Sequence, residues 1–388
     1  MFSSRLPAGL AANAITRTEA AARARGAVIL DLTATNPTAV GLPDLDWAGV
    51  FDVPALGRYD PHPFGLPAAR AVVARDGGWV GVDPARVVLT ASTSEAYAFL
   101  FKLLCNPGDE VLVPRPSYPL FDLLTQLDSV RPVPYQLDAA GAWCIDRDSV
   151  QQALSSRTRA LLVVSPNNPT GSMLRRDDGE WLVTMAVERG LAIIADEVFA
   201  SYRLADRPDT LSLAGESRAL VFTLGGLSKS AGMPQMKLAW ILANGPEPLV
   251  TEALARLEII ADTYLSVSLP VQRAVSALMQ RGRQMQAAIA QRLAGNLATL
   301  REVVAASPWL TLLEPDGGWS AVLRVPAILR EEDLVMRLIE EASVLVHPGY
   351  FFDFPREAYL VVSLLPRPDV FLSAITRVAH LAGMEVVT

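Results

Sequence analysis

Residues 86–114 read RVVLTASTSEAYAFLFKLLCNPGDEVLVP and contain two short apolar runs separated by a helix-like segment. The run at 86–91 predicts a strand. The segment at 92–104 predicts a helix, which ends at the turn CNPGDE, and 111–114 predicts a second strand. Strands that are apolar on both faces and alternate with helices are typical of a mostly parallel sheet covered by helices on both sides. This stretch therefore predicts an α/β fold.

The same rhythm continues to residue 243. Further helices are predicted at 117–127, near 147–155 and near 178–189, and further strands at 131–137, 160–165, 191–196, 219–224 and 237–243. A glycine-rich loop too short for a crossover helix joins the last two strands, so we expect that pair to be antiparallel.

The two ends of the chain follow a different pattern. Before residue 35 we expect a helix at 12–25 and a short strand at 27–32. After residue 246 we expect helices over 247–307, a strand after PDGGW, a helix near 331–341, strands at 343–348 and 359–365, and a last helix. We therefore expect a large α/β domain over residues 35–270 and a smaller α+β domain formed by residues 1–34 and 271–388.

Composition excludes several classes of protein. The chain has 388 residues, 51% of them hydrophobic, and a formal net charge of −7, which argues against a general nucleic-acid or membrane-surface binder. No run approaches the ~18 apolar residues of a membrane-spanning helix, and the N-terminus has no apolar signal core. Cys105 and Cys144 lack metal-ligand spacing and the three histidines are scattered, so we expect no metal site and a reducing, cytoplasmic location.

Chemically active residues follow the predicted strands. In open parallel sheets ligands bind beyond the carboxyl ends of the strands. The segments at these ends are STSE at 92–95, RPSYP at 115–119, PNNPTG at 166–171, DEV at 196–198 and GGLSKS at 225–230. Hydroxyl, aromatic, amide, carboxylate and amine groups should therefore converge on one edge of the sheet.

The tetrad STSE fits a capping box, with Ser92 at the N-cap and Glu95 three residues later. It serves either to cap the helix alone or also to bind a phosphate through free amides and the hydroxyls of Thr93 and Ser94. In the second case a cation must offset Glu95, and Lys237 is the candidate.

Three other residues each have two interpretations. Asp196 ends a very apolar strand and either caps the next turn or pairs with a cationic ring nitrogen. Asn168 either belongs to a simple turn or presents a donor. Tyr118 either packs or stacks on a ring.

Lys229 decides among these interpretations. It lies among small residues between two apolar strands, and an unpaired buried ammonium is costly. A lysine with a lowered pKa becomes a nucleophile toward an aldehyde. A phosphate cradle, a carboxylate for a pyridinium nitrogen, an aromatic lid and such a lysine together describe a pyridoxal phosphate site.

With SPNNPTG, DEVF and SKS followed by Lys237, the chain resembles the class I and II aminotransferases of the fold-type I pyridoxal phosphate enzymes. The resemblance runs from LDLTATNP at 30–37 to VVSLLP at 361–366. It implies that Lys229 forms the Schiff base and moves the proton between Cα and the cofactor. It also implies that Asp196 keeps the ring nitrogen protonated, that Asn168 donates to the phenolic oxygen and that Tyr118 stacks on the ring.

The resemblance also implies a phosphate site and a dimer. Its phosphate-binding residues would be Thr93, Ser94, Ser228 and Lys237. Tyr59 would reach the phosphate of a neighbouring subunit, which implies a homodimer with sites at the interface. Asn36 and Arg367 are the expected substrate contacts.

The chain departs from the family pattern at several places. Phe199 stands where the family usually has a tyrosine, Gly226 where it often has a serine, and Lys237 where it usually has an arginine. Val361 stands where many members carry the arginine that binds the substrate carboxylate. Either Arg367 replaces that arginine or the substrate has no carboxylate beside its amine.

Asp262 lies near the segment where dicarboxylate-specific relatives often carry an arginine. It either disfavours acidic donors by like-charge repulsion or is a solvated residue at a helix end.

These features predict a transaminase that alternates between two cofactor forms in a ping-pong cycle. Another pyridoxal phosphate reaction on the same fold, such as carbon–sulfur β-elimination, decarboxylation or retro-aldol cleavage, is the alternative. A non-enzymatic sensor is a third class, and the intact Lys229 argues against it.

Overall fold

The computed structural model describes residues 2–387 except residues 8, 10, 53–55, 139–142 and 266. The helices are α1 (Ala14–Ala24), α2 (Pro67–Asp76), α3 (Thr93–Leu104), α4 (Leu120–Leu127), α5 (Arg147–Ala153), α6 (Arg176–Arg189), α7 (Leu227–Ser230), α8 (Glu247–Tyr264), α9 (Leu269–Ala305), α10 (Glu331–Ala342) and α11 (Pro368–Val387). The strands are β1 (Leu30–Asp31), β2 (Val87–Thr90), β3 (Glu110–Arg115), β4 (Arg131–Asp138), β5 (Cys144–Ile145), β6 (Thr158–Val164), β7 (Ala192–Asp196), β8 (Val221–Gly226), β9 (Ala239–Asn244), β10 (Thr311–Leu313), β11 (Ser320–Arg324), β12 (Val344–Leu345), β13 (His347–Pro348) and β14 (Tyr359–Ser363).

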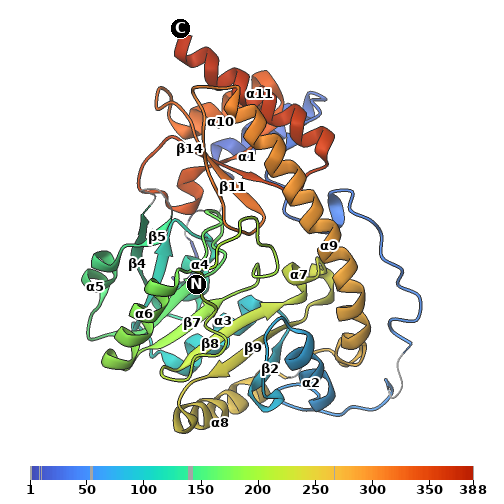
Figure 1. Cartoon of the computed structure of the whole chain (residues 1–388), viewed down its shortest axis with the longest axis vertical. Coiled ribbons are helices and arrows are strands. Elements are labelled where there is room, and N and C mark those ends of the chain that lie inside the picture. The colour runs from blue at the N-terminus through green and yellow to red at the C-terminus, as the bar shows by residue number, and fades with distance from the viewer. Residues whose placement is uncertain are drawn as a thin grey trace.

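The largest sheet has the strand order β2-β9-β8-β7-β6-β3-β4-β5 and occupies the lower part of Figure 1. Its central strands, from β8 through β7, β6 and β3 to β4, pair in parallel. The predicted antiparallel pairing of β8 with β9 is confirmed. The predicted α/β fold with a mostly parallel sheet is therefore confirmed.

Alternating strand residues point to opposite faces of this sheet. In β6, Leu162 packs into a core shared with α3 and α8, whereas Leu161 packs into a core shared with α5 and α6. In β7, Ala192 and Ile194 belong to the α3 face, so Asp196, two residues further, points to that face as well. The position of Asp196 therefore follows from the alternation of its strand.

A second sheet with the order β10-β11-β14-β13 lies above the first and packs with α10 and α11 (Figure 1). The strand expected at 343–348 is instead two short strands. β12 pairs in parallel with β1, whereas β13 pairs antiparallel with β14. This segment passes from one sheet to another, and a continuous apolar run does not reveal that its partner changes.

The 37-residue helix α9 runs diagonally from the upper to the lower part of the molecule in Figure 1. Near its start, Ala274 and Leu278 pack with strands of the large sheet. Further along, Ile289 and Leu293 pack with the small sheet. The predicted division at residues 34/35 and 270/271 stays a prediction. Within the described residues, no helix is both long and apolar enough to cross a membrane.

Candidate active site

Lys229 lies on the short helix α7, directly after β8. The residues before it are small because the neighbouring strand is close. A Cβ atom on Gly225 would lie 2.4 Å from Nε1 of Trp240 in β9, and one on Gly226 would lie 3.0 Å from Cβ of Ala239. The small residues around the lysine are therefore needed for packing.

Two aromatic rings lie beside the Lys229 ammonium. Its Nζ lies 5.0 Å from the ring centre of Trp319 and 5.6 Å from that of Phe199. Burial lowers the pKa of Lys229, and the negative charge of Asp196 opposes this effect. The amine is therefore nearer to its neutral, nucleophilic form than an exposed lysine would be.

Asp196 is buried at the end of β7, on the α3 face. Its Oδ2 accepts a hydrogen bond of 2.7 Å from the hydroxyl of Tyr97, and its Oδ1 accepts one of 3.1 Å from the amide of Val198. Burial raises the pKa of Asp196, and the hydrogen bond from Tyr97 is the largest opposing effect. In the described part of the chain this carboxylate has no ion pair, so it is suited to bind a cationic group.

The loop between β6 and α6 holds its two asparagines differently. The side chain of Asn167 is buried and bonds to Ser117, Thr170 and the carbonyl of Pro116. The half-buried side chain of Asn168 has no hydrogen bond to any residue that the structure describes. Asn167 therefore fixes the loop, and Asn168 remains available to a ligand.

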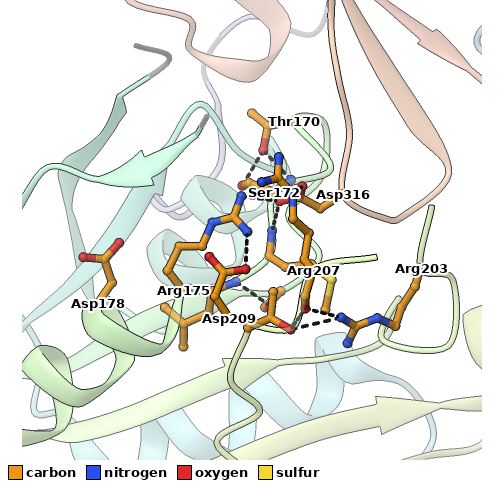
Figure 2. A network of polar contacts seen from close by, with 12 residues as sticks. Thr170, Ser172, Arg175, Asp178, Arg203, Arg207, Asp209 and Asp316 are labelled. Carbon is orange, nitrogen blue, oxygen red and sulfur yellow. Dashed lines mark hydrogen bonds and ion pairs between the residues drawn. The ribbon is translucent and has the colours of Figure 1, made fainter. Parts of the chain in front are cut away.

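A polar network holds the end of the same loop (Figure 2). Arg175 and Arg207 form ion pairs of 2.9 and 3.0 Å with the buried Asp316. The amide of Asp316 donates to the carbonyl of Gly171, and its own carbonyl accepts from the amide of Leu204. This network joins the PNNPTG loop to the segment between β10 and β11, which leads to Trp319.

Ser92 caps α3 as expected, whereas the Glu95 carboxylate binds the amide one residue before the one that a capping box uses. Oγ of Ser92 accepts from the amide of Glu95 at 3.1 Å, and the carboxylate of Glu95 accepts from the amide of Ala91 at 2.6 Å. Thr93 and Ser94 occupy the first two positions of the helix, where backbone amides have no helical partner. The helix start therefore offers free donors to an anion.

Two further residues expected at the phosphate follow β8. Ser228 is half-buried on α7, beside Lys229. Lys237 is exposed, has a positive φ of 51°, and makes no ion pair with any described residue. Its ammonium is available to an anion.

The aromatic residues of the site differ in their partners. Tyr118 is exposed and packs edge-on against Phe121, and partial burial, followed by the charge of Asp196, raises its pKa. The hydroxyl of Tyr202 is buried and donates to the carbonyl of Lys229 at 2.8 Å. The Tyr202 hydroxyl is therefore used in a hydrogen bond to the backbone. It does not take the place of the tyrosine hydroxyl that is missing at Phe199.

Val361 lies in the middle of β14 and is 2% exposed. It packs with Val322 in the core that the small sheet shares with the large sheet. Arg367 lies beyond the strand end, exposed, and forms a two-point ion pair with Asp369, with distances of 3.1 and 2.8 Å. To bind a substrate, Arg367 would have to leave this pair.

The two other predicted contact residues are exposed. Oδ1 of Asn36 accepts from the amide and hydroxyl of Thr38, at 3.1 and 2.8 Å. The side chain of Tyr59 is 76% exposed, a large value for an aromatic side chain. No described residue in the same chain covers it.

Two residues of the site, Tyr97 and Trp319, are not predicted from the sequence. Tyr97 is the only tyrosine in the apolar stretch AYAFLF at 96–101, which is a detectable signal, but its partner Asp196 lies 99 residues away in the sequence. Trp319 directly follows the glycine pair of PDGGW, a motif that by itself predicts only the start of a strand. Tyr97 binds Asp196, and the Trp319 ring lies beside the Lys229 amine.

Comparison with known proteins gives a consistent result. A match to the family described as "Aminotransferase class I and II" covers residues 61–367. An alanine aminotransferase from Mycobacterium tuberculosis is 28% identical over 372 residues, covering 92% of this chain and 86% of the relative. A glutamate-pyruvate aminotransferase from Haemophilus influenzae is 26% identical over 369 residues, covering 92% and 91%.

Solved structures share the fold. An aminotransferase from Escherichia coli matches with a TM-score of 0.86 and 24% identity, covering 98% of both chains. An alanine aminotransferase from Pyrococcus furiosus matches with a TM-score of 0.85 and 22% identity, covering 98% of this chain and 99% of its own.

Proposed function

This chain belongs to the class I and II aminotransferase family, whose members use pyridoxal phosphate, and we propose that its Lys229 site holds that cofactor. The chain is a transaminase that acts on small amino and keto substrates. The observation that carries the cofactor assignment is the half-buried Lys229 amine beside the rings of Trp319 and Phe199, close enough to Asp196 for that charge to act on its pKa.

The residues present fit the cofactor. Pyridoxal phosphate, when bound, supplies an aldehyde that condenses with amines and a ring that accepts electrons from Cα. The lowered pKa of Lys229 suits its amine to bond to the aldehyde carbon. The buried Asp196, with no ion pair among the described residues, suits the ring nitrogen, and Asn168 has a free side chain for the phenolic oxygen.

We assign the phosphate to the start of α3. The free amides and the hydroxyls of Thr93 and Ser94 would bind it, together with Ser228 and Lys237. The lysine ammonium is a point charge, whereas a planar arginine guanidinium would bind the phosphate in a fixed geometry. Lys237 should therefore hold the phosphate in a less fixed orientation. Tyr118 would cover one face of the ring.

Lys229 would also move the proton. With the cofactor bound, its Nζ would accept a proton from the Cα of the donor and would return it on the cofactor side. Burial lowers the pKa of Lys229, so its amine is more readily neutral and able to accept that proton than the amine of an exposed lysine.

The alternative reactions are not favoured. The relatives reported above are all named aminotransferases, and none is named a lyase or a decarboxylase. A sensor without activity has no support from them either.

Substrate choice depends on Val361. An apolar residue there removes the usual arginine partner of the substrate carboxylate, so we propose that Arg367 or Asn36 supplies the contact or that the donor lacks an α-carboxylate. Asp262 would disfavour acidic side chains. We therefore propose that glutamate and aspartate are poor donors and that neutral or amine-type donors are better.

We also propose a homodimer in which Tyr59 reaches the phosphate of the neighbouring subunit. The support is the exposure of Tyr59. A cytoplasmic location stays a prediction from the sequence.

The test is the half-reaction. An amino donor alone should convert the bound cofactor to its amine form, read from the visible spectrum, and borohydride should fix the cofactor on Lys229 by mass. Donors to compare are alanine, glutamate, a longer neutral amino acid and an amino alcohol. An adduct on Lys237 would contradict the lysine assignment, and glutamate as the best donor would contradict the argument from Val361.

The same assay tests Arg367. Arg367→Ala should lower kcat/KM about 10–100-fold for α-amino acids, the effect of losing one charge-assisted hydrogen bond. A variant that handles every donor like the unmodified protein would exclude Arg367 as the anchor.

A further inference from the structure

A buried tyrosine–aspartate pair joins α3 to the end of β7. The hydroxyl of Tyr97 donates to Oδ2 of Asp196 at 2.7 Å, and the two residues are 2% and 7% exposed. The core that packs around the Tyr97 ring is otherwise apolar. A polar pair in an apolar core has an energetic cost unless every member is satisfied.

Packing holds the Tyr97 ring in place. Its centre lies 5.4 Å from that of Phe121, edge to face, and 6.0 Å from that of Phe101. The hydroxyl therefore cannot turn away from Asp196 without disturbing this core.

The two donors leave capacity on the carboxylate. Tyr97 binds Oδ2 and the amide of Val198 binds Oδ1, at 3.1 Å. An ionised carboxylate accepts about four hydrogen bonds, so one more donor can bind. Tyr97 and Val198 thus fix the plane of the carboxylate while its remaining lone pairs stay free.

In this pair the tyrosine is always the donor and the carboxylate always the acceptor. Burial, and then the charge of Asp196, raise the pKa of Tyr97 well above its usual value, so its hydroxyl remains a donor. The same hydrogen bond is the largest effect opposing the raised pKa of Asp196. Without it, the carboxylate would hold a proton more readily and attract a cation less.

We propose that Tyr97 is a positioning residue, whose hydroxyl keeps the Asp196 carboxylate ionised and oriented toward the ring nitrogen of pyridoxal phosphate. This inference rests on the proposed function of the Lys229 site. Tyr97 acts through Asp196 and touches neither substrate nor cofactor.

The experiment compares two ligands on Tyr97→Phe. One is pyridoxal phosphate and the other is its carbocyclic analogue, in which a C–H group replaces the ring nitrogen. The affinity for pyridoxal phosphate should fall about 10–100-fold, as for loss of a hydrogen bond to a charged group. The affinity for the analogue should change little, because it has no ring nitrogen for Asp196 to bind.

Tyr135→Phe is the matched control. Tyr135 is equally buried, and its hydroxyl donates to the carbonyl of Leu162 at 2.9 Å, away from Asp196. It should not change the ratio of the two affinities. A double variant with Asp196→Asn adds a second measurement, in which the effect of Tyr97→Phe on pyridoxal phosphate should disappear.

The outcomes distinguish a failure of the role given to Tyr97 from a failure of the proposed cofactor site. Equal losses for both ligands, or an undiminished affinity for pyridoxal phosphate, would overturn the role of Tyr97. If the unmodified protein did not distinguish the two ligands, the assignment of Asp196 to the ring nitrogen, and with it the proposed site, would fail instead.

Discussion

At the scale of single residues, Lys229 is placed where a lysine weakens the fold. Its pKa is lowered by burial, with only partial compensation from Asp196. A group with this shift loses its proton more easily in the folded than in the unfolded chain, so it destabilises the fold most at pH values below its folded pKa. The cost disappears as the pH rises toward the unfolded value of about 10.4.

We therefore expect Lys229→Met to raise the melting temperature of the cofactor-free protein at pH 7 and to raise it less at pH 10. Lys237→Met is the control, because the side chain of Lys237 is exposed. Melting curves at the two pH values measure the effect. A stabilisation that does not depend on pH would show that shape, and not charge, is the cause.

Phe199 is the second informative residue, because the family usually has a tyrosine there. Restoring that hydroxyl should add a hydrogen bond to the charged phenolic oxygen of the bound cofactor, worth about 1.5–3 kcal/mol. One pKa unit is about 1.4 kcal/mol. Phe199→Tyr should therefore lower the pKa of the lysine–cofactor linkage, whose protonation changes the visible absorption band, by about one unit.

Spectral titration measures this shift, and Tyr202→Phe provides the comparison. The hydroxyl of Tyr202 donates to the carbonyls of Lys229 and Ser230, so its removal should leave the titration unchanged. If Tyr202→Phe shifted the band and Phe199→Tyr did not, the roles given to these two residues would be reversed.

At the scale of secondary-structure elements, Ser92 connects helix capping to ligand binding. Its side chain caps α3, whose start offers the proposed phosphate site. Ser92→Ala should cost about 1 kcal/mol of the free energy of unfolding. It should also weaken pyridoxal phosphate binding, because the amides at the helix start become less well ordered.

Asp146→Ala is the matched variant. Asp146 caps α5 through a hydrogen bond of 3.0 Å from the amide of Ser149, and α5 belongs to another face of the sheet. Both variants should lose similar stability in urea, whereas only Ser92→Ala should lose cofactor affinity. Equal affinities for the two variants would mean that the start of α3 does not bind the phosphate.

Local pattern was sufficient to predict most elements and the order of the site segments. The expected convergence of Asp196, Asn168 and Lys229 rests on one rule, that parallel strands end at the same edge. The pair of Tyr97 and Asp196 could not be predicted in this way, because it depends on which helix covers which face. The division of 343–348 into β12 and β13 depends in the same way on distant partners, β1 and β14.

At the scale of the whole molecule, the proposed exchange of Tyr59 would make each site depend on two chains. Tyr59 is exposed, and α8 also presents exposed apolar side chains, among them Leu249 and Ile259. In a symmetric dimer each subunit would give its Tyr59 to the other and receive one in return.

Mixed dimers test this exchange. Lys229→Ala removes the essential amine from a subunit's own site, whereas Tyr59→Ala should damage the site of its neighbour. A hybrid of the two variants therefore contains one site with both defects and one intact site. A one-to-one mixture, exchanged in mild urea and refolded, should regain about one quarter of the sites of the unmodified protein. Activity no higher than the average of the two pure variants would mean that Tyr59 acts within its own subunit or not at all.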